Sequence, residues 1–428
     1  MSLKSGFGAG KQDQEQEGNG IVQIRPTNVG SEGNLKFDKN VYLPLALLET
    51  QQNNFLQKGD VLFNNTNSQE WVGKTAFFNE DGNFLFSNHI TRIRTKNDVL
   101  PQFLVLLLNT LHSKKLFYSI CTNWNNQSGV GIELLRSLKI PVPPLEIQTE
   151  IIAVFETAYN SKKEKETEAA QLLACIDGYL LEALGITLPP PSEKKIFFNV
   201  SSSEINHERF DPYYHQSEFK DLELALINGR YEIKSFRKLA RKITSGTTPK
   251  AGGDAYTDYS LGVPFIRSGE INEFDEIDLN DVVFIKPDTH NRALKSSQLK
   301  KNDLMIAIVG ATIGQVGIFK YDFEANINQA IALVRFNDSI SVEFVKSFLK
   351  TTIGQKILDK LKRPVARANI NLEEIASIKI PLPPLEKQIE IADHISALRS
   401  QAKQLQDEAQ VKLERAKIEV ERMIFGEK

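Results

Sequence analysis

Two long segments of the chain place apolar residues at helical spacing. Residues 148–184 carry such a stripe around a middle rich in lysine and glutamate, and residues 388–423 repeat it more regularly. In the second segment the apolar positions advance by steps of four and three residues, which is the seam of a coiled coil. One extra step of four, from Ala409 to Leu413, is a stutter that locally unwinds the supercoil. Both segments are predicted to be helices of roughly 55 Å, and Gly185 is predicted to end the first.

The apolar stripes predict that the two helices pack against each other. A stripe this long cannot be buried by its own half of the chain, so the equivalent helix of the other half is the natural partner. Because the helices leave two similar domains, we expect them to run antiparallel. The alternative is two independent helices, each folded back on its own domain. The residues predicted to make the helix contact are Ile151, Phe155, Leu173, Leu180, Ile391, Ile395, Leu398, Leu405, Leu413 and Val420.

A proline-rich phrase precedes each helix. Residues 139–146 and 379–386 both read Lys-Ile-Pro-x-Pro-Pro-Leu-Glu. Consecutive prolines hold the residues before them extended, and the last proline suits the first turn of a helix, where the following glutamate is also favoured. One copy would be an ordinary helix start. Two copies at the same place in two similar halves indicate an internal repeat.

The two halves repeat one order of strands and turns, from Ser5 to the first phrase and from Ser245 to the second. Apolar strands end in polar loops, glycine turns lead into buried strands, and each half closes with an amphipathic helix, at 101–118 or 342–361. This order predicts an α+β fold with two pseudo-repeated, strand-rich domains, separated by two long helices packed as an antiparallel coiled coil. The predicted segments are a first domain at 1–145, a helix at 146–186, a linker at 187–200, a second domain at 201–385 and a helix at 386–428.

Composition and charge exclude several classes of protein. The charged and apolar fractions are those of a globular protein, and the longest apolar runs are too short to cross a bilayer, so we expect a cytoplasmic protein without membrane association. The two cysteines and six histidines stand without ligand spacing, so no disulfide framework, metal site or cofactor is predicted. A net charge of −2 excludes a uniformly cationic surface, but it permits focused basic clusters such as those at 230–250 and 356–367.

No arrangement of residues in the sequence predicts catalysis. There is no Ser/His/Asp order, paired-carboxylate site, metal motif or phosphate loop. The segment Asp211-Pro212-Tyr213-Tyr214 is close to the Asp-Pro-Pro-Tyr motif of adenine methyltransferases, but it lacks the second proline and a preceding glycine-rich strand. We interpret it as a turn with packed tyrosines, and the chain as a protein without a catalytic centre.

The loops of both halves instead carry amide, cationic, hydroxyl and aromatic side chains. Asparagine and glutamine can pair with adenine in the major groove, arginine and lysine with guanine, and the remaining cations with phosphate. The alternative is that asparagine-rich loops are ordinary turns. Placement at equivalent positions of a repeat favours DNA binding. The predicted DNA-binding residues are Arg25, Thr27, Asn28, Asn65, Asn67, Trp71, Lys74, Asn125, Gln127, Thr247, Thr248, Lys250, Arg267, Ser268, Thr312, Gln315, Arg363, Arg367 and Asn369.

With the repeat, the phrases and the helices in place, the chain resembles a specificity (S) subunit of a type I restriction-modification system. The resemblance covers nearly the whole chain and is strongest at 139–148 and 379–388, at the two Ser-Gly domain openings, and at 209–214. It implies two target-recognition domains, each reading one half of a split site in double-stranded DNA. It also implies that the paired helices dock DNA adenine methyltransferase (M) subunits, through which restriction (R) subunits join.

One departure from the family pattern concerns the first domain. The second half has an arm at 204–244 before its Ser-Gly, whereas the first half has only residues 1–4, so the first domain is expected to lack an opening helix and strand. Two other interpretations remain open. The chain is alternatively the recognition region of a single-chain type II-like restriction-methylation enzyme, or a coiled-coil assembly protein that does not bind DNA.

Overall fold

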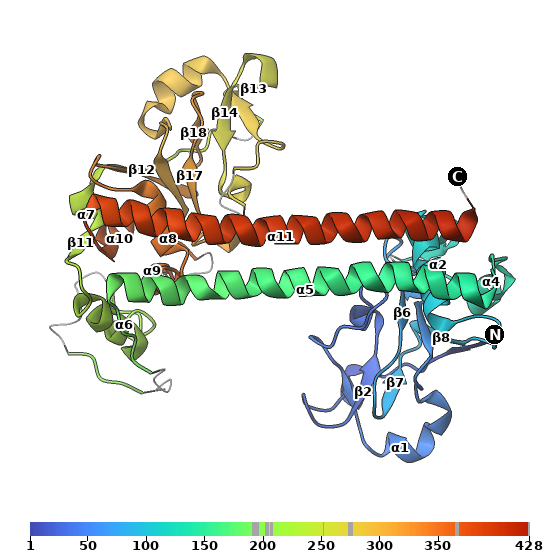
Figure 1. The fold of residues 1–428 in the computed structure, drawn as a ribbon. Helices are drawn as coiled ribbons and strands as arrows, with labels where there is room; N and C mark the ends of the chain where they lie inside the picture. Colours follow the sequence, from blue (N-terminus) through green and yellow to red (C-terminus); the bar gives the residue numbers. More distant parts are fainter. Residues whose placement is uncertain are drawn as a thin grey trace. The chain divides into compact units, whose positions relative to one another are not determined.

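The chain folds into two compact units. The computed structural model describes residues 1–125, 127–190, 197–201, 205, 209–250, 252–272, 277–363 and 368–426. Unit 1 comprises Met1–Thr167 and Leu405–Lys428, and unit 2 comprises Glu168–Gln404. Two continuous helices, α5 (Leu145–Leu184) and α11 (Leu385–Phe425), each contribute one end to either unit (Figure 1). Each unit therefore consists of a strand-rich domain and two helix ends.

Within the described residues, unit 1 contains three small sheets. An antiparallel sheet has the order β1 (Ser2–Ser5), β8 (Ile90–Arg94), β4 (Val61–Asn64), β6 (Thr75–Phe77). The second has the order β3 (Tyr42–Leu43), β2 (Ile21–Ile24), β7 (Phe84–Phe86), and β2 runs parallel to β7. The third has the order β5 (Thr66–Asn67), β10 (Gln127–Gly129), β9 (Thr122–Trp124). Its helices are α1 (Leu47–Thr50), α2 (Pro101–Ser113), α3 (Leu116–Ile120) and α4 (Ile132–Ser137).

The core of unit 1 lies on both faces of strand β4, whose four residues are all buried. Successive side chains of a strand point to opposite faces of the sheet. Phe63 therefore packs with the helices α2 and α3, where its ring centroid lies 5.0 Å from that of Phe117, while Leu62 belongs to the cluster on the other face. Burial on both faces explains why this segment reads as a continuous apolar run.

Unit 2 repeats this plan with additional elements. Its antiparallel sheet has the order β12 (Ala240–Ser245), β19 (Ile331–Phe336), β16 (Asp303–Ala307), β17 (Val316–Phe319). A second sheet has the order β13 (Tyr256–Thr257), β15 (Val283–Ile285), β14 (Val263–Ile266), β18 (Asn326–Ile327), and a third pairs β11 (Ile233–Ser235) with β20 (Lys379–Pro381). Its helices are α6 (Ser217–Ile227), α7 (Phe236–Leu239), α8 (Val342–Leu349), α9 (Thr352–Leu361) and α10 (Leu372–Ser377).

A buried ion pair occupies the same place in both domains. Arg94 on β8 donates from Nε to Oδ1 of Asp60 at 2.6 Å, and Arg335 on β19 donates to Asp303 in the same way at 2.7 Å. Asp60 directly precedes β4, Asp303 is the first residue of β16, and both are almost completely buried. Identical strand order and an identical ion pair confirm the predicted internal repeat and the α+β fold.

The helix expected at the end of each domain is broken in two. In unit 1, α2 stops before Lys115, whose φ of +60° is left-handed and ends the helical run before α3. In unit 2, α8 and α9 are separated at Thr351, whose hydroxyl caps the second helix by accepting from the Gly354 N–H. The apolar spacing continues across both breaks, which is why periodicity alone predicts one helix.

The long helices pack against each other in an antiparallel sense. In unit 1 the beginning of α5 meets the end of α11: Ile151 shares a buried cluster with Val420, and Ala158 shares another with Leu413. In unit 2 the opposite ends meet, and Leu180 lies in one cluster with Ile391 and Ile395. The two helices end at glycines in the left-handed conformation, Gly185 (φ +63°), as predicted, and Gly426 (φ +69°). The alternative of helices folded back on separate domains is therefore wrong.

The predicted helix contact needs one correction. Leu173 is 41% exposed, whereas Ile176, three residues on, is buried against α11 in unit 2, so the prediction that Leu173 joins the helices is wrong. Ala169 and Ile176 occupy the buried side of this part of α5, so Leu173 lies outside the buried stripe. Phe155, Leu398 and Leu405 are partly buried, and the first two pack against the buried clusters.

Each proline phrase is fixed to its domain by a buried glutamine. Gln148 accepts from the Leu100 N–H at 2.8 Å and donates to the carbonyl oxygens of Asp98 at 2.9 Å and Pro143 at 2.8 Å. Gln388 repeats this pattern in unit 2 with Ser341, Ser339 and Pro383. The amide thereby connects the helix, the phrase and the start of the domain's first closing helix in both units.

Candidate nucleic-acid interface

An exposed hairpin in unit 1 carries several of the predicted DNA-binding residues. Strands β9 and β10 form the hairpin, with Trp124 opposite Gln127, and β10 also pairs with β5. All three residues of β9 are exposed, and Trp124 is 46% exposed although its ring packs over Gly129, where a Cβ atom would lie 2.4 Å from it. Asn125 occupies the turn with a positive φ of 37°. The hairpin thus presents an aromatic face and amide side chains to solvent.

A second aromatic and cationic group follows strand β5. Lys74 Nζ lies 3.5 Å from the centroid of the Trp71 ring, which is 51% exposed. Burial lowers the pKa of Lys74, and the nearby positive charge of Lys36 lowers it further. Gly73 makes this arrangement possible, because its φ is +97° and a Cβ there would lie 2.3 Å from the Phe117 ring. Two lysines and an exposed indole form a site suited to phosphate and base contacts.

In unit 2, an open groove of about 550 Å³ brings predicted residues together. Its lining includes the polar residues Thr248, Arg267 and Asn328 and the aromatic residues Tyr259 and Phe284. Tyr259 is 81% exposed and meets Phe284 edge to face at 5.1 Å. The groove therefore combines hydrogen-bonding groups with an exposed ring, as the hairpin of unit 1 does.

Arg25 and Arg267 hold equivalent positions at the ends of β2 and β14. Each is followed by a short 3-10 turn whose third residue accepts a hydrogen bond from the arginine's own backbone N–H. Arg25 donates through Nε to Gln23 and through Nη2 to the Ala9 carbonyl, and burial lowers its pKa. Arg267 Nε donates to the buried carboxylate of Glu270 at 2.6 Å. Within the described residues Nη1 of both arginines is without a hydrogen bond, so each guanidinium is oriented but keeps donors for a ligand.

Two asparagines predicted to bind DNA are structural instead. Asn28 is 1% exposed; its Oδ1 accepts from the Arg25 N–H and its Nδ2 donates to the Lys36 carbonyl. Asn65 is 7% exposed and donates to Thr91 Oγ1 at 2.9 Å. Both amides replace backbone partners in tight loops and are not accessible to DNA, so these two predictions are wrong.

The remaining predicted residues differ in exposure and in hydrogen bonding. Thr27, Gln127, Thr247 and Lys250 are exposed, and Asn67, Ser268 and Thr312 are partly exposed. Arg363 and Asn369 pair through their backbones, and Arg363 also contacts the carboxylate of Glu374 at 3.0 Å. Gln315 is partly exposed, with a buried Oε1 that has no hydrogen-bond partner within the described residues. Arg367 lies outside the described residues.

The segment 209–216 is an anchored turn, as predicted. Arg209 is almost buried and forms ion pairs with Asp211 at 2.7 Å and with Glu374. The Tyr213 hydroxyl donates to Asp359, and burial followed by this hydrogen bond raises the pKa of the phenol. The tyrosines are thus packed side chains, and nothing in this turn has the geometry of a base-holding site.

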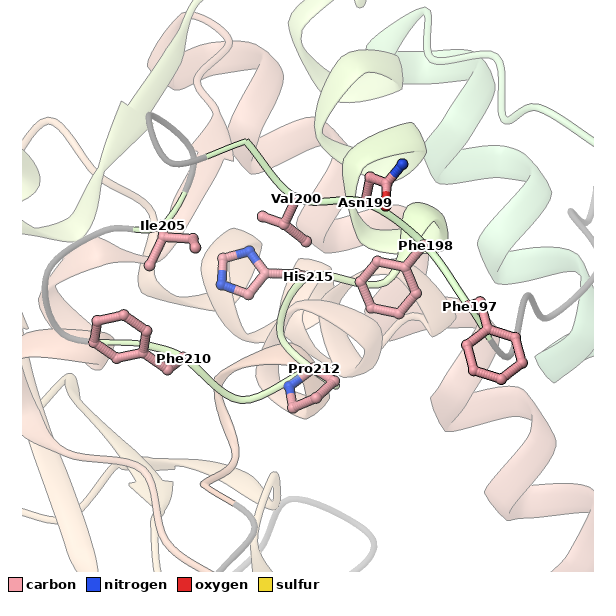
Figure 2. A pocket seen from close by; sticks show the side chains of 8 residues that line it. All are labelled: Phe197, Phe198, Asn199, Val200, Ile205, Phe210, Pro212 and His215. Carbon is pink, nitrogen blue, oxygen red and sulfur yellow. The ribbon is translucent and has the colours of Figure 1, made fainter.

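A cavity of about 660 Å³ adjoins this turn. Figure 2 shows its lining, which is mostly aromatic and aliphatic: Phe197, Phe198, Asn199, Val200, Ile205, Phe210, Pro212 and His215. His215 is buried, and its Nε2 lies 3.1 Å from the Arg209 carbonyl oxygen. The described residues contain no cluster of metal-ligating side chains, and none of their helices is long and apolar enough to cross a membrane. Among the described residues that line the cavity there is no acid–base pair of the kind that catalysis requires.

Comparison with known proteins identifies the family. The family model described as the type I restriction modification DNA specificity domain matches residues 11–173 and again 230–415. The chain is 28% identical over 347 residues to a putative type I restriction enzyme MjaX specificity subunit of Methanocaldococcus jannaschii, covering 79% of this chain and 71% of the relative. It is 32% identical over 301 residues to the EcoBI specificity subunit of Escherichia coli, covering 67% of this chain but only 59% of the relative.

A solved structure supports the same fold. A chain from a study of complex assembly and conformational transition in the type I R-M system superimposes with a TM-score of 0.56 at 15% identity, covering 95% of this chain and 91% of that one. The two family matches fall one on each repeat and include parts of both long helices. This chain therefore belongs to the family of type I restriction-modification DNA specificity subunits.

Proposed function

We propose that this chain is a non-catalytic recognition subunit that reads a bipartite site in double-stranded DNA, each domain reading one half. The observation that carries the proposal is the family match in each repeat, with oriented arginines at equivalent strand ends in both domains. Two reading modules joined by continuous helices would read two short sequences within one site. The proposed domains are 1–145 and 201–385, with helices at 146–186 and 386–428.

The exposed loops support two kinds of DNA contact. Lys74 and Lys250 are suited to phosphate, which positions a protein on the duplex without reading sequence. Asn125 and Gln127 present amides that can pair with adenine in the major groove. Arg25 uses Nε and one N–H of Nη2 for intramolecular contacts, so Nη1 and the second N–H of Nη2 stay available to pair with guanine. Arg267 Nη2 contacts both Glu270 and Asp281, so this arginine offers Nη1.

The long helices are the proposed docking surface for partner subunits of a cytoplasmic complex. Both expose apolar side chains away from their shared seam, at 36–54% exposure: Leu145, Ile147, Val411 and Ile418 in unit 1, and Leu173, Leu385 and Ile389 in unit 2. Exposed apolar residues aligned on a helix favour a partner helix. DNA adenine methyltransferase subunits would bind here and bring restriction subunits with them, and the modification chemistry would belong to those partners.

The proposal is tested by a methylation footprint of the chain together with its methyltransferase subunits. A split recognition sequence with an undefined spacer is expected, and methylation without any bipartite preference would contradict the proposal. In parallel, Lys250→Glu should weaken DNA binding for all sequences and lower the slope of log K against log salt by about 1. Asn125→Ala should instead relax the preference at one base pair by about 1–3 kcal/mol. Lys379→Glu, an equal charge reversal at an exposed residue of the second proline phrase, is the matched control.

A further inference from the structure

The open groove of unit 2 has a wall of aromatic side chains. Its lining includes Tyr256, Tyr259, Phe265 and Phe284. Phe265 is 1% exposed and meets Tyr256 edge to face at 6.4 Å, and the hydroxyl of Tyr256 donates to the Pro249 carbonyl oxygen at 3.1 Å. Three of the rings are partly or completely buried in the domain, and Tyr259, which is 81% exposed, is the one that extends into solvent.

Tyr259 is highly exposed, but its backbone is fixed. It opens the 3-10 turn Tyr259–Leu261, in which the Leu261 N–H donates to the Asp258 carbonyl oxygen at 3.2 Å. The turn lies close to β15 because it is followed by Gly262, where a Cβ atom would lie 2.5 Å from the Cβ of Phe284. The tyrosine ring itself packs against Phe284. A ring placed in this way offers contact area to a ligand at a small cost in conformational entropy.

Polar groups along the same groove are complementary to the edge of a nucleobase. Within the described residues, Nη1 of Arg267 and Nδ2 of Asn328 make no hydrogen bond, although the Asn328 amide is oriented by accepting from the Ala330 N–H at 3.1 Å. The lining also contains the hydroxyl of Thr248 and the carboxylate of Asp258. Base edges carry both donors and acceptors. The carboxylate would repel a phosphate but can accept from an exocyclic amino group, so the groove suits a base better than a phosphate.

Unit 1 has no aromatic side chain at the place of Tyr259. Strands β14 and β2 are equivalent, since each pairs antiparallel with one neighbour and parallel with the other. The fourth residue before the strand is Tyr259 in unit 2 and Glu17 in unit 1. Glu17 is exposed, and its carboxylate offers no surface for stacking. Arg25 follows β2 as Arg267 follows β14, so the two units share the arginine and differ in the ring.

We propose that this groove holds one nucleobase of the half-site that unit 2 reads, displaced from the base stack, with its face on Tyr259 and its edge toward Arg267 and Asn328. The proposal rests on the proposed function and names the ligand of the groove. Both faces of a base inside a duplex are covered by its neighbours, so the contact requires local unstacking. The exposed tyrosine ring then replaces a lost neighbour of the base. The polar groups contact a base whose pairing edge is no longer covered by the opposite strand.

A thermodynamic cycle between Tyr259 and the DNA tests the contact. The full-length chain is assembled with its methyltransferase subunits and bound to duplexes that carry the split site found by the methylation footprint. Tyr259→Ala should weaken binding to the intact site about tenfold, measured by fluorescence anisotropy. Each nucleotide of both half-sites is then replaced in turn by an abasic nucleotide. At one position the loss caused by Tyr259→Ala should disappear, because the base that the ring contacts is absent. The same loss at every position, or no loss on the intact site, would overturn the proposal.

Further variants separate stacking from other effects. Tyr259→Phe keeps the ring and should bind within about threefold of wild type. Tyr259→Leu keeps an apolar side chain without a flat face and should lose nearly as much affinity as Tyr259→Ala. Glu17→Ala, at the equivalent place in unit 1, is the matched control, and its effect should be the same at every abasic position. Equal binding by the leucine and phenylalanine variants would overturn the proposal.

The two levels of the proposal fail in different ways. A wild-type complex that prefers the split site, while all variants at Tyr259 bind as tightly as wild type, would overturn the role of the groove and leave the proposed function standing. A wild-type complex without preference for the split site would contradict the proposed function and the groove contact together.

Discussion

The hydrogen bonds by which Gln148 and Gln388 fix the proline phrases to their domains are called the glutamine joint below. Replacing Gln148 by alanine tests whether this joint is a main source of stability in unit 1. The side chain is completely buried, and its amide makes three hydrogen bonds to backbone groups. Alanine would leave the Leu100 N–H and the carbonyl oxygens of Asp98 and Pro143 without this partner at a partly buried place. The variant therefore removes the hydrogen bonds between α5 and the domain of unit 1 and leaves the residues of its hydrophobic clusters unchanged.

The expected magnitude follows from those three groups. Leaving a buried backbone group unpaired costs about 1–3 kcal/mol. Taking the low end for each, the free energy of unfolding of unit 1 should fall by about 3 kcal/mol. For a unit of this size the loss corresponds to a Tm lower by about 6–12 °C.

Urea unfolding followed by circular dichroism measures the loss, and hydrogen exchange locates it. Exchange of the Leu100 amide should become faster, while amides in the middle of β4 keep their wild-type protection until global unfolding. Gln171→Ala is the matched control, because Gln171 is exposed on the same helix, and it should change stability by less than about 0.5 kcal/mol. A similarly small effect of Gln148→Ala, with unchanged exchange at Leu100, would show that the amide is dispensable and refute the reasoning.

Three further predictions concern strained and charged positions. Gly73→Ala should destabilise unit 1 by about 2–4 kcal/mol in urea unfolding, because its φ is +97° and the new Cβ would lie 2.3 Å from the Phe117 ring; a loss below about 1 kcal/mol would contradict this. Glu374→Ala should lower the stability of unit 2 by about 3 kcal/mol, because the buried guanidinium of Arg209 loses one of its carboxylates; a thermal midpoint equal to wild type would exclude it. Burial alone would raise the pKa of Asp211, but hydrogen bonds led by that of Arg209 outweigh it and lower the pKa overall. The ionised carboxylate therefore stabilises the fold above its unfolded pKa of about 3.9, and this stabilisation is lost as pH falls through the lower folded pKa. The urea midpoint of Asp211→Asn should consequently fall less steeply on acidification than that of the wild type. Parallel plots of urea midpoint against pH for the two proteins would contradict this prediction.

Local patterns in the sequence predicted the architecture well. The stepwise stripe from Ile391 to Val420 contains the information for a long helix with one buried face, because helical phase depends only on spacing. The doubled proline phrase located the joints for a similar reason, since proline restricts the backbone wherever it stands. These features depend on residues close together in the chain.

The details of the candidate interface depend on contacts that spacing does not encode. Asn28 and Asn65 have the composition of binding loops, but whether a turn asparagine faces solvent or caps the loop depends on its neighbours in space. The contact of Lys74 with Trp71 requires the left-handed turn at Gly73. The structural role of Gln148 and Gln388 was not predicted, although the sequence contains a signal for it. Each glutamine stands at the same distance after its proline phrase. A glutamine at equivalent positions of a repeat indicates that both copies make the same hydrogen bonds.

The glutamine joint has a consequence for how such chains can be recombined. All the groups that Gln148 and Gln388 hold are backbone atoms, so the joint does not depend on which side chains the domain carries. A domain transplanted with its phrase and the residues just before its closing helices would bring matching attachment points to an unchanged helix. The loops of the domain can then diverge or be exchanged while its attachment to the helices stays the same. Because the attachment uses backbone atoms, changes in the loop side chains leave the way the domain is held unchanged.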